Sequence, residues 1–129
     1  MGDRGQVLIK DEGVYLYTHW GASGLVDTVK NALAHKERWD DPEYLARIIF
    51  CEMVGEADAL AGSTGFGIGT EKHEDVWRVV IVNCADHKVI VEDNNKAVFS
   101  GSFEEFIAEF QLHKIENLLS KGRATGFPE

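Results

Sequence analysis

Short runs of apolar and β-branched residues, separated by polar turns, predict a chain rich in β-strands. Two runs near the N-terminus flank the polar triplet at residues 11–13, a spacing that predicts a hairpin. The run at residues 76–82 is almost continuously apolar, as expected for a central strand. Two shorter runs follow it and complete a predicted meander, while glycines punctuate one further candidate strand. The predicted strands are residues 6–10, 14–20, 66–69, 76–82, 89–91 and 97–99.

Three other segments carry apolar residues at the three- and four-residue spacing of an amphipathic α-helix. Ser23 is the predicted N-cap of the first helix, and Asp41 followed by Pro42 is a strong start signal for the second. Ser102 and Glu105 form a predicted capping box at the start of the third. The predicted helices span residues 24–38, 42–54 and 103–119.

The order of these elements, ββαα(β)βββα, indicates a single α+β domain. We expect an antiparallel sheet, built from the N-terminal hairpin and the C-terminal meander, packed with about three helices. The chain of 129 residues is long enough to bury the core of one domain. This domain is expected to cover residues 1–119, followed by a loosely ordered polar tail at residues 120–129.

Composition and charge narrow the classes of function. With 44% hydrophobic and 27% charged residues, the chain has the composition of a soluble globular protein. Its 13 basic and 22 acidic residues give a net charge of −9, which disfavours binding to nucleic-acid phosphates. Such binding would need a local basic patch built from Lys30, Lys36, Lys114, Lys121 and Arg123. Without a long apolar run or a secretory leader pattern, we expect a cytoplasmic protein with no membrane partner.

The second predicted strand stops at a small-residue turn, residues 21–24, which we call the elbow. A strand that runs into a glycine turn and a helix start presents backbone N–H groups to a ligand. His19, Gly21, Ser23 and Gly24 are therefore candidate ligand-binding residues, with the imidazole as an anion contact. The alternative is purely structural: the glycines satisfy backbone geometry, Ser23 caps the helix, and His19 packs. No Lys-Ser or Lys-Thr pair of a phosphate loop follows the glycines.

A second glycine-rich stretch, residues 64–70, would border a pocket if the fold brings it to the elbow. It lacks the strand–helix context of a dinucleotide fingerprint, so structural glycines are the favoured interpretation. In such a pocket His19 would act as general acid or base or as an anion contact, with Arg47 or Arg78 supplying fixed charge. This alternative describes a small-molecule or nucleotide-binding protein or enzyme, and no residue is assigned a catalytic role.

The preferred hypothesis is a non-enzymatic binding or interaction domain that self-associates as a homo-oligomer. Tyr15, Tyr17 and His19 alternate along the second strand and form a predicted half-exposed aromatic row. An exposed row of this kind, together with free sheet edges, suits a contact with a protein or a small ligand. The opposite face of the strand is predicted to be buried in the core; it carries Val14, Leu16, Thr18 and Trp20.

Metal and thiol chemistry have little support in the sequence. None of the five histidines pairs with another ligand at a zinc-like spacing, so neither a metal nor another cofactor is expected. Cys51 and Cys84 lie in apolar runs and are predicted to be free, buried and unreactive.

Three segments carry a resemblance to a known family. They are Tyr15-Leu16-Tyr17-Thr18-His19-Trp20-Gly21, the run from Arg38-Trp39-Asp40-Asp41-Pro42 to Phe50, and Thr64-Gly65-Phe66-Gly67-Ile68. In these motifs the first two-thirds of the chain resembles a family of small uncharacterised proteins from prokaryotic and phage genomes. The resemblance implies no activity. It implies that the elbow, the Arg-Trp-Asp-Asp-Pro junction and the Gly-Phe-Gly strand share one surface or core.

Overall fold

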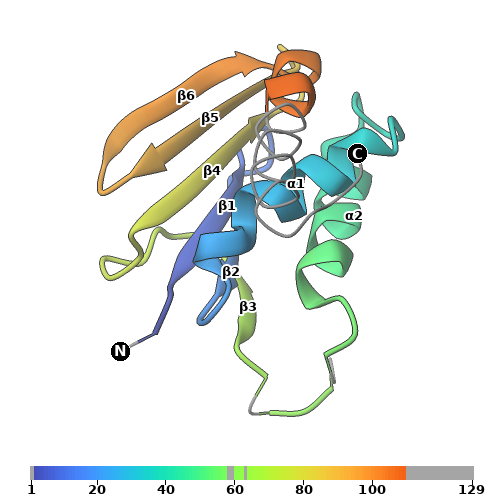
Figure 1. The fold of residues 1–129 in the computed structure, drawn as a ribbon. Coiled ribbons are helices and arrows are strands. Elements are labelled where there is room, and N and C mark those ends of the chain that lie inside the picture. The colour runs from blue at the N-terminus through green and yellow to red at the C-terminus, as the bar shows by residue number, and fades with distance from the viewer. Residues whose placement is uncertain (1, 58–59, 63, 110–129) are drawn as a thin grey trace, which may run out of the picture.

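A computed structural model describes residues 2–57, 60–62 and 64–109 of the chain. Within this part, six strands form one sheet in the order β3-β2-β1-β4-β5-β6, and α1 and α2 pack on one face of it (Figure 1). The strands are β1 Gly5–Ile9, β2 Val14–Thr18, β3 Phe66–Gly69, β4 Arg78–Asn83, β5 Lys88–Asp93 and β6 Lys96–Ser102. The helices are η1 Ala22–Gly24, a short 3₁₀ turn, α1 Leu25–Ala34 and α2 Pro42–Val54. Residues 103–109 are helical as well.

The α+β class is confirmed, but the predicted antiparallel sheet is wrong, because the sheet is mixed. β1 pairs with β2 antiparallel and with β4 parallel. The chain leaves β3 at one edge and crosses both β2 and β1 through residues 70–77 before it enters β4. This crossover is held in place by Gln6, whose side chain donates to the Glu71 carbonyl at 3.2 Å and accepts from the His73 N–H at 3.0 Å. The hairpin and the meander therefore join in parallel at the centre of the sheet.

The core lies between the sheet and the helices that cover it. Alternate residues of the central strands point into this layer, and the apolar stripes of α1 and α2 meet them there. Fully buried representatives are Val7, Ile9, Leu16, Val29, Leu33, Leu45, Ile49, Val80, Val82, Phe103 and Phe106. Lys30 is also buried, with 6% of its surface exposed, so it cannot contribute to the basic patch that nucleic-acid binding would need.

Two of the three predicted helix starts are confirmed by their hydrogen bonds. The Asp41 side chain accepts from the Tyr44 N–H at 3.4 Å, and Pro42 is the first residue of α2. Ser102 and Glu105 exchange reciprocal side-chain and backbone hydrogen bonds of 2.8 and 3.0 Å, as a capping box requires. The prediction for Ser23 is wrong, because η1 intervenes and Gly24 becomes the N-cap of α1 without a side-chain hydrogen bond.

Among the described residues no helix lies on the other side of the sheet, which we call the open face (Figure 1). Four partly exposed apolar side chains meet there in a cross-strand row over β2, β1, β4 and β5. The register pairs Tyr15 with Leu8, Leu8 with Ile81, and Ile81 with Ile90. We call these four residues the open-face row.

Some predictions fall on residues outside the described ranges. These are the second half of the third helix, the tail at residues 120–129, and Lys114, Lys121 and Arg123 of the basic patch. Over the ranges that are described, no helix is both long enough and apolar enough to span a membrane.

Candidate functional site

The backbone N–H groups at the elbow are paired within the chain. The Ser23 N–H donates to Asp3 Oδ2 at 2.8 Å, and the Ala22 N–H donates to the Asp3 carbonyl at 2.9 Å. The Gly21 N–H donates to Thr18 Oγ1 at 3.0 Å. The position that the sequence assigns to an external anion is thus occupied by the carboxylate of Asp3. An external anion would have to displace Asp3 to reach the elbow.

Asp3 is held as a carboxylate by its hydrogen bonds. Those from the side chain and backbone of Ser23, followed by that from Trp77, keep the pKa of Asp3 below its ordinary value of 3.8. The Trp77 indole N–H donates to Asp3 Oδ1 at 2.7 Å, which ties the start of the chain to the start of β4. Because the pKa is lower in the folded state, the contribution of Asp3 to stability is present above about pH 3.8 and is lost as the pH falls further.

We expect Asp3→Asn to lower the free energy of unfolding at neutral pH by about 0.5–1 kcal/mol, a modest figure because solvent screens this carboxylate. Urea unfolding of both proteins from neutral pH down to pH 3 checks the effect. The difference between them should shrink towards zero once Asp3 is protonated. A difference that stays constant with pH would contradict the role given to the charge.

His19 is anchored on the opposite side of β2 from the core. Its Nδ1 lies 3.3 Å from Arg4 Nε and 3.1 Å from the Tyr17 hydroxyl. Since the arginine Nε can only donate, Nδ1 is the acceptor of this hydrogen bond. Arg4 also pairs with Asp75 at 2.7 Å, and Trp20 packs edge-on against the imidazole at 4.4 Å between centroids. These contacts give His19 a structural explanation.

The structure does not bring Arg47 to His19 or to the elbow. Arg47 is exposed on α2 and lines a separate concavity together with His35 and Cys51. Arg78 lies closer, 3.5 Å from the Ala22 carbonyl. Its guanidinium is engaged by both carboxylate oxygens of Asp93, at 2.8 and 2.9 Å.

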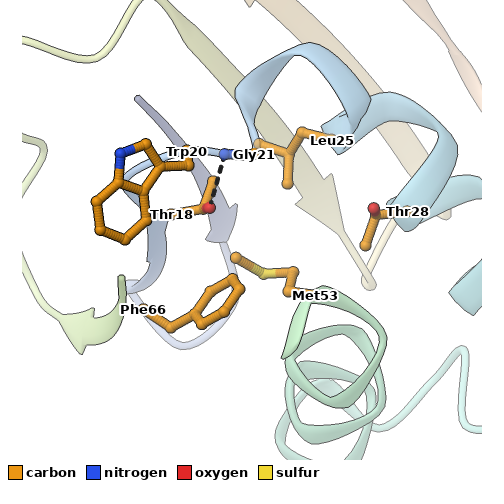
Figure 2. Close-up of a pocket in the computed structure, with 7 residues that line it drawn as sticks. All are labelled: Thr18, Trp20, Gly21, Leu25, Thr28, Met53 and Phe66. Carbon is orange, nitrogen blue, oxygen red and sulfur yellow. Dashed lines mark hydrogen bonds between the residues drawn. The ribbon is translucent and has the colours of Figure 1, made fainter. Parts of the chain in front are cut away.

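A cavity of about 210 Å³ opens beside the elbow, which we call the elbow cavity (Figure 2). It lies between the end of β2, the start of α1, the last turn of α2 and the start of β3. Its lining residues are Thr18, Trp20, Gly21, Leu25, Thr28, Met53 and Phe66. The elbow and the 64–70 stretch therefore do border one cavity, through Gly21 and Phe66. His19 is not part of its lining.

Five of the lining residues were not predicted as part of a site: Thr18, Trp20, Leu25, Thr28 and Met53. Leu25 and Met53 carry the apolar spacing of α1 and α2, so the pattern predicts them as core. Nothing in the sequence around Thr18 or Thr28 indicates that their hydroxyl groups line a cavity. The lining residues come from the end of β2, the elbow, α1, α2 and β3, and only the packing of α2 against the elbow places them together.

Trp20 does not lie in the core as predicted. Its side chain is 63% exposed and stands at the mouth of the elbow cavity. The indole crosses Gly65, where an added Cβ would lie 2.4 Å from Trp20 Cζ3. Gly65 thus allows the ring to lie against the backbone instead of turning inward.

The three residues of the predicted aromatic row are partly exposed but do not act as one surface. Tyr17 stacks on His73 of the crossover, with 4.4 Å between ring centroids, and His19 is held by Arg4. Tyr15 instead joins the open-face row through its neighbour Leu8. The available apolar surface therefore runs across the strands rather than along β2.

The two cysteines are free, but only one of them is buried. Burial, aided by the nearby carboxylate of Asp11, raises the pKa of the Cys84 thiol to about 12. Cys51 is exposed on α2, against the prediction. The described side chains include no group of three His, Cys, Asp or Glu residues placed to hold a metal ion.

Comparison with known proteins returns nothing similar: no family model, no curated protein and no solved structure matches this chain. The family resemblance therefore stays a prediction. The candidate sites that the structure shows are the open-face row and the elbow cavity.

Proposed function

We propose that this chain is a non-enzymatic binding domain that forms a homodimer through its open face. The observation that carries the proposal is the open-face row, four apolar side chains in register on a sheet surface that no described helix covers. The hydrogen bonds that anchor His19 support a role without catalysis. Free cysteines favour a cytoplasmic location, which belongs to the same proposal.

Two copies of such a surface can bury their rows against each other. Sheets that pack face to face lie about 10 Å apart, a spacing that interdigitated apolar side chains fill. Each square ångström of apolar surface removed from water contributes about 25 cal/mol. Leu8 and Ile81 lie on the two central strands, so they would form the middle of the contact, with Tyr15 and Ile90 at its ends.

Charges on β5 favour one orientation of the two copies. Lys88 and Glu92 flank Ile90 on the open face, two residues to either side. In a dimer whose two-fold axis lies in the interface and crosses the strands at right angles, Lys88 of each copy faces Glu92 of the other. A two-fold axis parallel to the strands and centred between β1 and β4 would instead place β5 opposite β2 of the other copy, so these charge pairs would not form. The reciprocal pairs also offset part of the repulsion between two chains of net charge −9.

We expect Lys88→Glu to weaken the dimer about tenfold or more, because two attractive pairs become two repulsive ones. Glu92→Lys should act in the same way, and the double variant, which exchanges the two charges, should restore the dimer. Sedimentation equilibrium at low salt, with concentrations up to the high micromolar range, measures all four proteins.

Two controls separate this orientation from general charge effects. Lys96→Glu changes the net charge by the same amount at the exposed edge strand β6, and it should leave the dimer intact. Ile90→Asp should abolish the dimer because it buries an unpaired charge within the apolar contact. A monomeric wild-type protein at high micromolar concentration, or a double variant that stays monomeric, would overturn the proposal.

The second candidate function, binding of a small molecule near the elbow, is favoured by the elbow cavity. Among its described lining residues none is ionisable, and His19 lies outside it. This argues against the nucleotide and enzyme versions of that function, because phosphates and reacting groups require polar or charged partners.

A further inference from the structure

The elbow cavity has the size of a ring-shaped ligand. A dry apolar cavity of about 150 Å³ is large enough to bind benzene, and this one measures about 210 Å³. Leu25, Met53 and Phe66 supply apolar walls from α1, α2 and β3, and they face one another across the hollow (Figure 2). Trp20 adds an aromatic surface at the mouth.

One polar group in the cavity has an unused donor. Thr18 is buried, with 3% of its surface exposed, and its Oγ1 accepts from the Gly21 N–H at 3.0 Å (Figure 2). A threonine hydroxyl can donate one hydrogen bond besides those it accepts. No described residue offers an acceptor to the Thr18 proton. A buried donor without an acceptor costs stability, and a ligand that accepts from it recovers that cost.

The second hydroxyl in the lining is already used as a donor. Thr28 Oγ1 donates to the Gly24 carbonyl at 3.0 Å, as threonines on helices often do with the preceding turn. The Thr28 side chain lies on α1 among the residues that line the cavity (Figure 2). Since no lining residue carries a charge, a charged ligand would be desolvated without a partner.

We propose that the elbow cavity binds a small neutral molecule that combines an apolar ring with one hydrogen-bond acceptor, which the Thr18 hydroxyl contacts. The ring lies between Met53 and Phe66 with Trp20 over its outer edge. This site is separate from the open face, because its lining residues lie on the helix side of the sheet. Binding does not depend on the proposed homodimer.

Three probes of nearly equal shape test the proposal. Acetophenone has the ring and a carbonyl acceptor, α-methylstyrene replaces that carbonyl by a methylene group, and benzoate carries a negative charge. We expect acetophenone to bind with a dissociation constant of about 0.1–1 mM, the range for so few heavy atoms. α-Methylstyrene should bind about tenfold more weakly because it leaves the Thr18 donor unpaired. Benzoate should not bind.

Binding is followed by NMR on the full chain, through the indole N–H of Trp20 and the methyl group of Met53. Thr18→Val should remove the preference for acetophenone over α-methylstyrene, while Thr18→Ser should keep it. Thr70→Val, an exposed threonine outside the cavity, is the matched control. Thr28→Phe fills the cavity from a partly exposed helix position and should abolish binding of both ring compounds while the fold is retained.

Several outcomes would overturn this inference. They are the absence of shifts at Trp20 and Met53 with acetophenone, equal binding of benzoate, and undiminished affinity in Thr28→Phe. The same titration on the Ile90→Asp variant separates the two proposals. Acetophenone binding to a monomeric variant supports the cavity whether or not the wild-type protein dimerises.

Discussion

We expect Phe103→Ala to lower the free energy of unfolding by about 3–5 kcal/mol. Phe103 has no exposed surface, although it stands at the very start of the helix at residues 103–109. Its ring stacks on His87 with 5.1 Å between centroids and meets Trp39 edge-on at 5.2 Å. Truncation leaves a cavity between three segments that are distant in the chain.

The contacts around Phe103 explain why its truncation should lower the free energy of unfolding more than truncation of an ordinary core residue. The Phe103 N–H donates to the His87 carbonyl at 2.8 Å, and His87 is itself paired with Asp40 at 2.6 Å. The Trp39 indole N–H donates to the Leu33 carbonyl at 3.0 Å, which fixes the indole against the other side of the Phe103 ring. Because hydrogen bonds fix His87 and Trp39, these walls cannot collapse into the vacated space. The free-energy cost of the cavity therefore adds to the cost of losing the ring.

Urea unfolding measures this loss. The matched control is Val98→Ala on β6, where the side chain is 60% exposed and the change should stay within about 0.5 kcal/mol. A loss below about 1 kcal/mol for Phe103→Ala would show that the aromatic contacts do not hold these segments together.

Arg78→Met is expected to lower the free energy of unfolding by about 2 kcal/mol. Arg78 and Asp93 face each other on neighbouring strands, with side chains only 17% and 22% exposed. Removing the guanidinium leaves the carboxylate of Asp93 in a poorly hydrated position without its partner. The loss is smaller than for a fully buried pair because about a fifth of each side chain still contacts water.

The double variant Arg78→Met with Asp93→Leu tests that explanation. Replacing both charges by apolar groups removes the unpaired carboxylate, so the total loss should fall below about 1 kcal/mol. Arg38→Met serves as the exposed comparison, because the Arg38–Asp41 pair is 3.6 Å long and solvated, and it should cost about 0.5 kcal/mol or less. A double variant as unstable as Arg78→Met alone would mean that Arg78 acts through its contact with Trp77, at 4.5 Å, instead of through charge.

Features that depend on near neighbours in the chain could be predicted from the sequence. The capping box at Ser102 and the start of α2 at Asp41 involve residues no more than three positions apart, so the local pattern contains all the information. The alternation along β2 also correctly predicted that Leu16 is buried and that Tyr15 is partly exposed. Local sterics and the two-residue repeat of a strand are sufficient for such predictions.

The placement of the elbow residues could not be obtained in this way. Asp3 lies 20 positions before Ser23, and nothing in either segment indicates that the carboxylate meets that N–H group. Trp20 continues the apolar side of β2 and was predicted as core, but Gly65, more than forty residues later, gives it room on the surface. A one-dimensional pattern describes the preference of a side chain and not the surface that is available to it.

The sequence alone therefore determined the α+β class, most element positions and the buried faces of the strands, because these follow from local periodicity and capping. Tertiary structure decided the parallel pairing of β1 with β4, since the crossover from β3 has to pass two strands before it can rejoin the sheet. It also decided both candidate sites. The open-face row joins residues of four strands, and the elbow cavity joins Thr18, Met53 and Phe66 from three elements. Such contacts depend on how the elements pack, which no single stretch of the chain encodes.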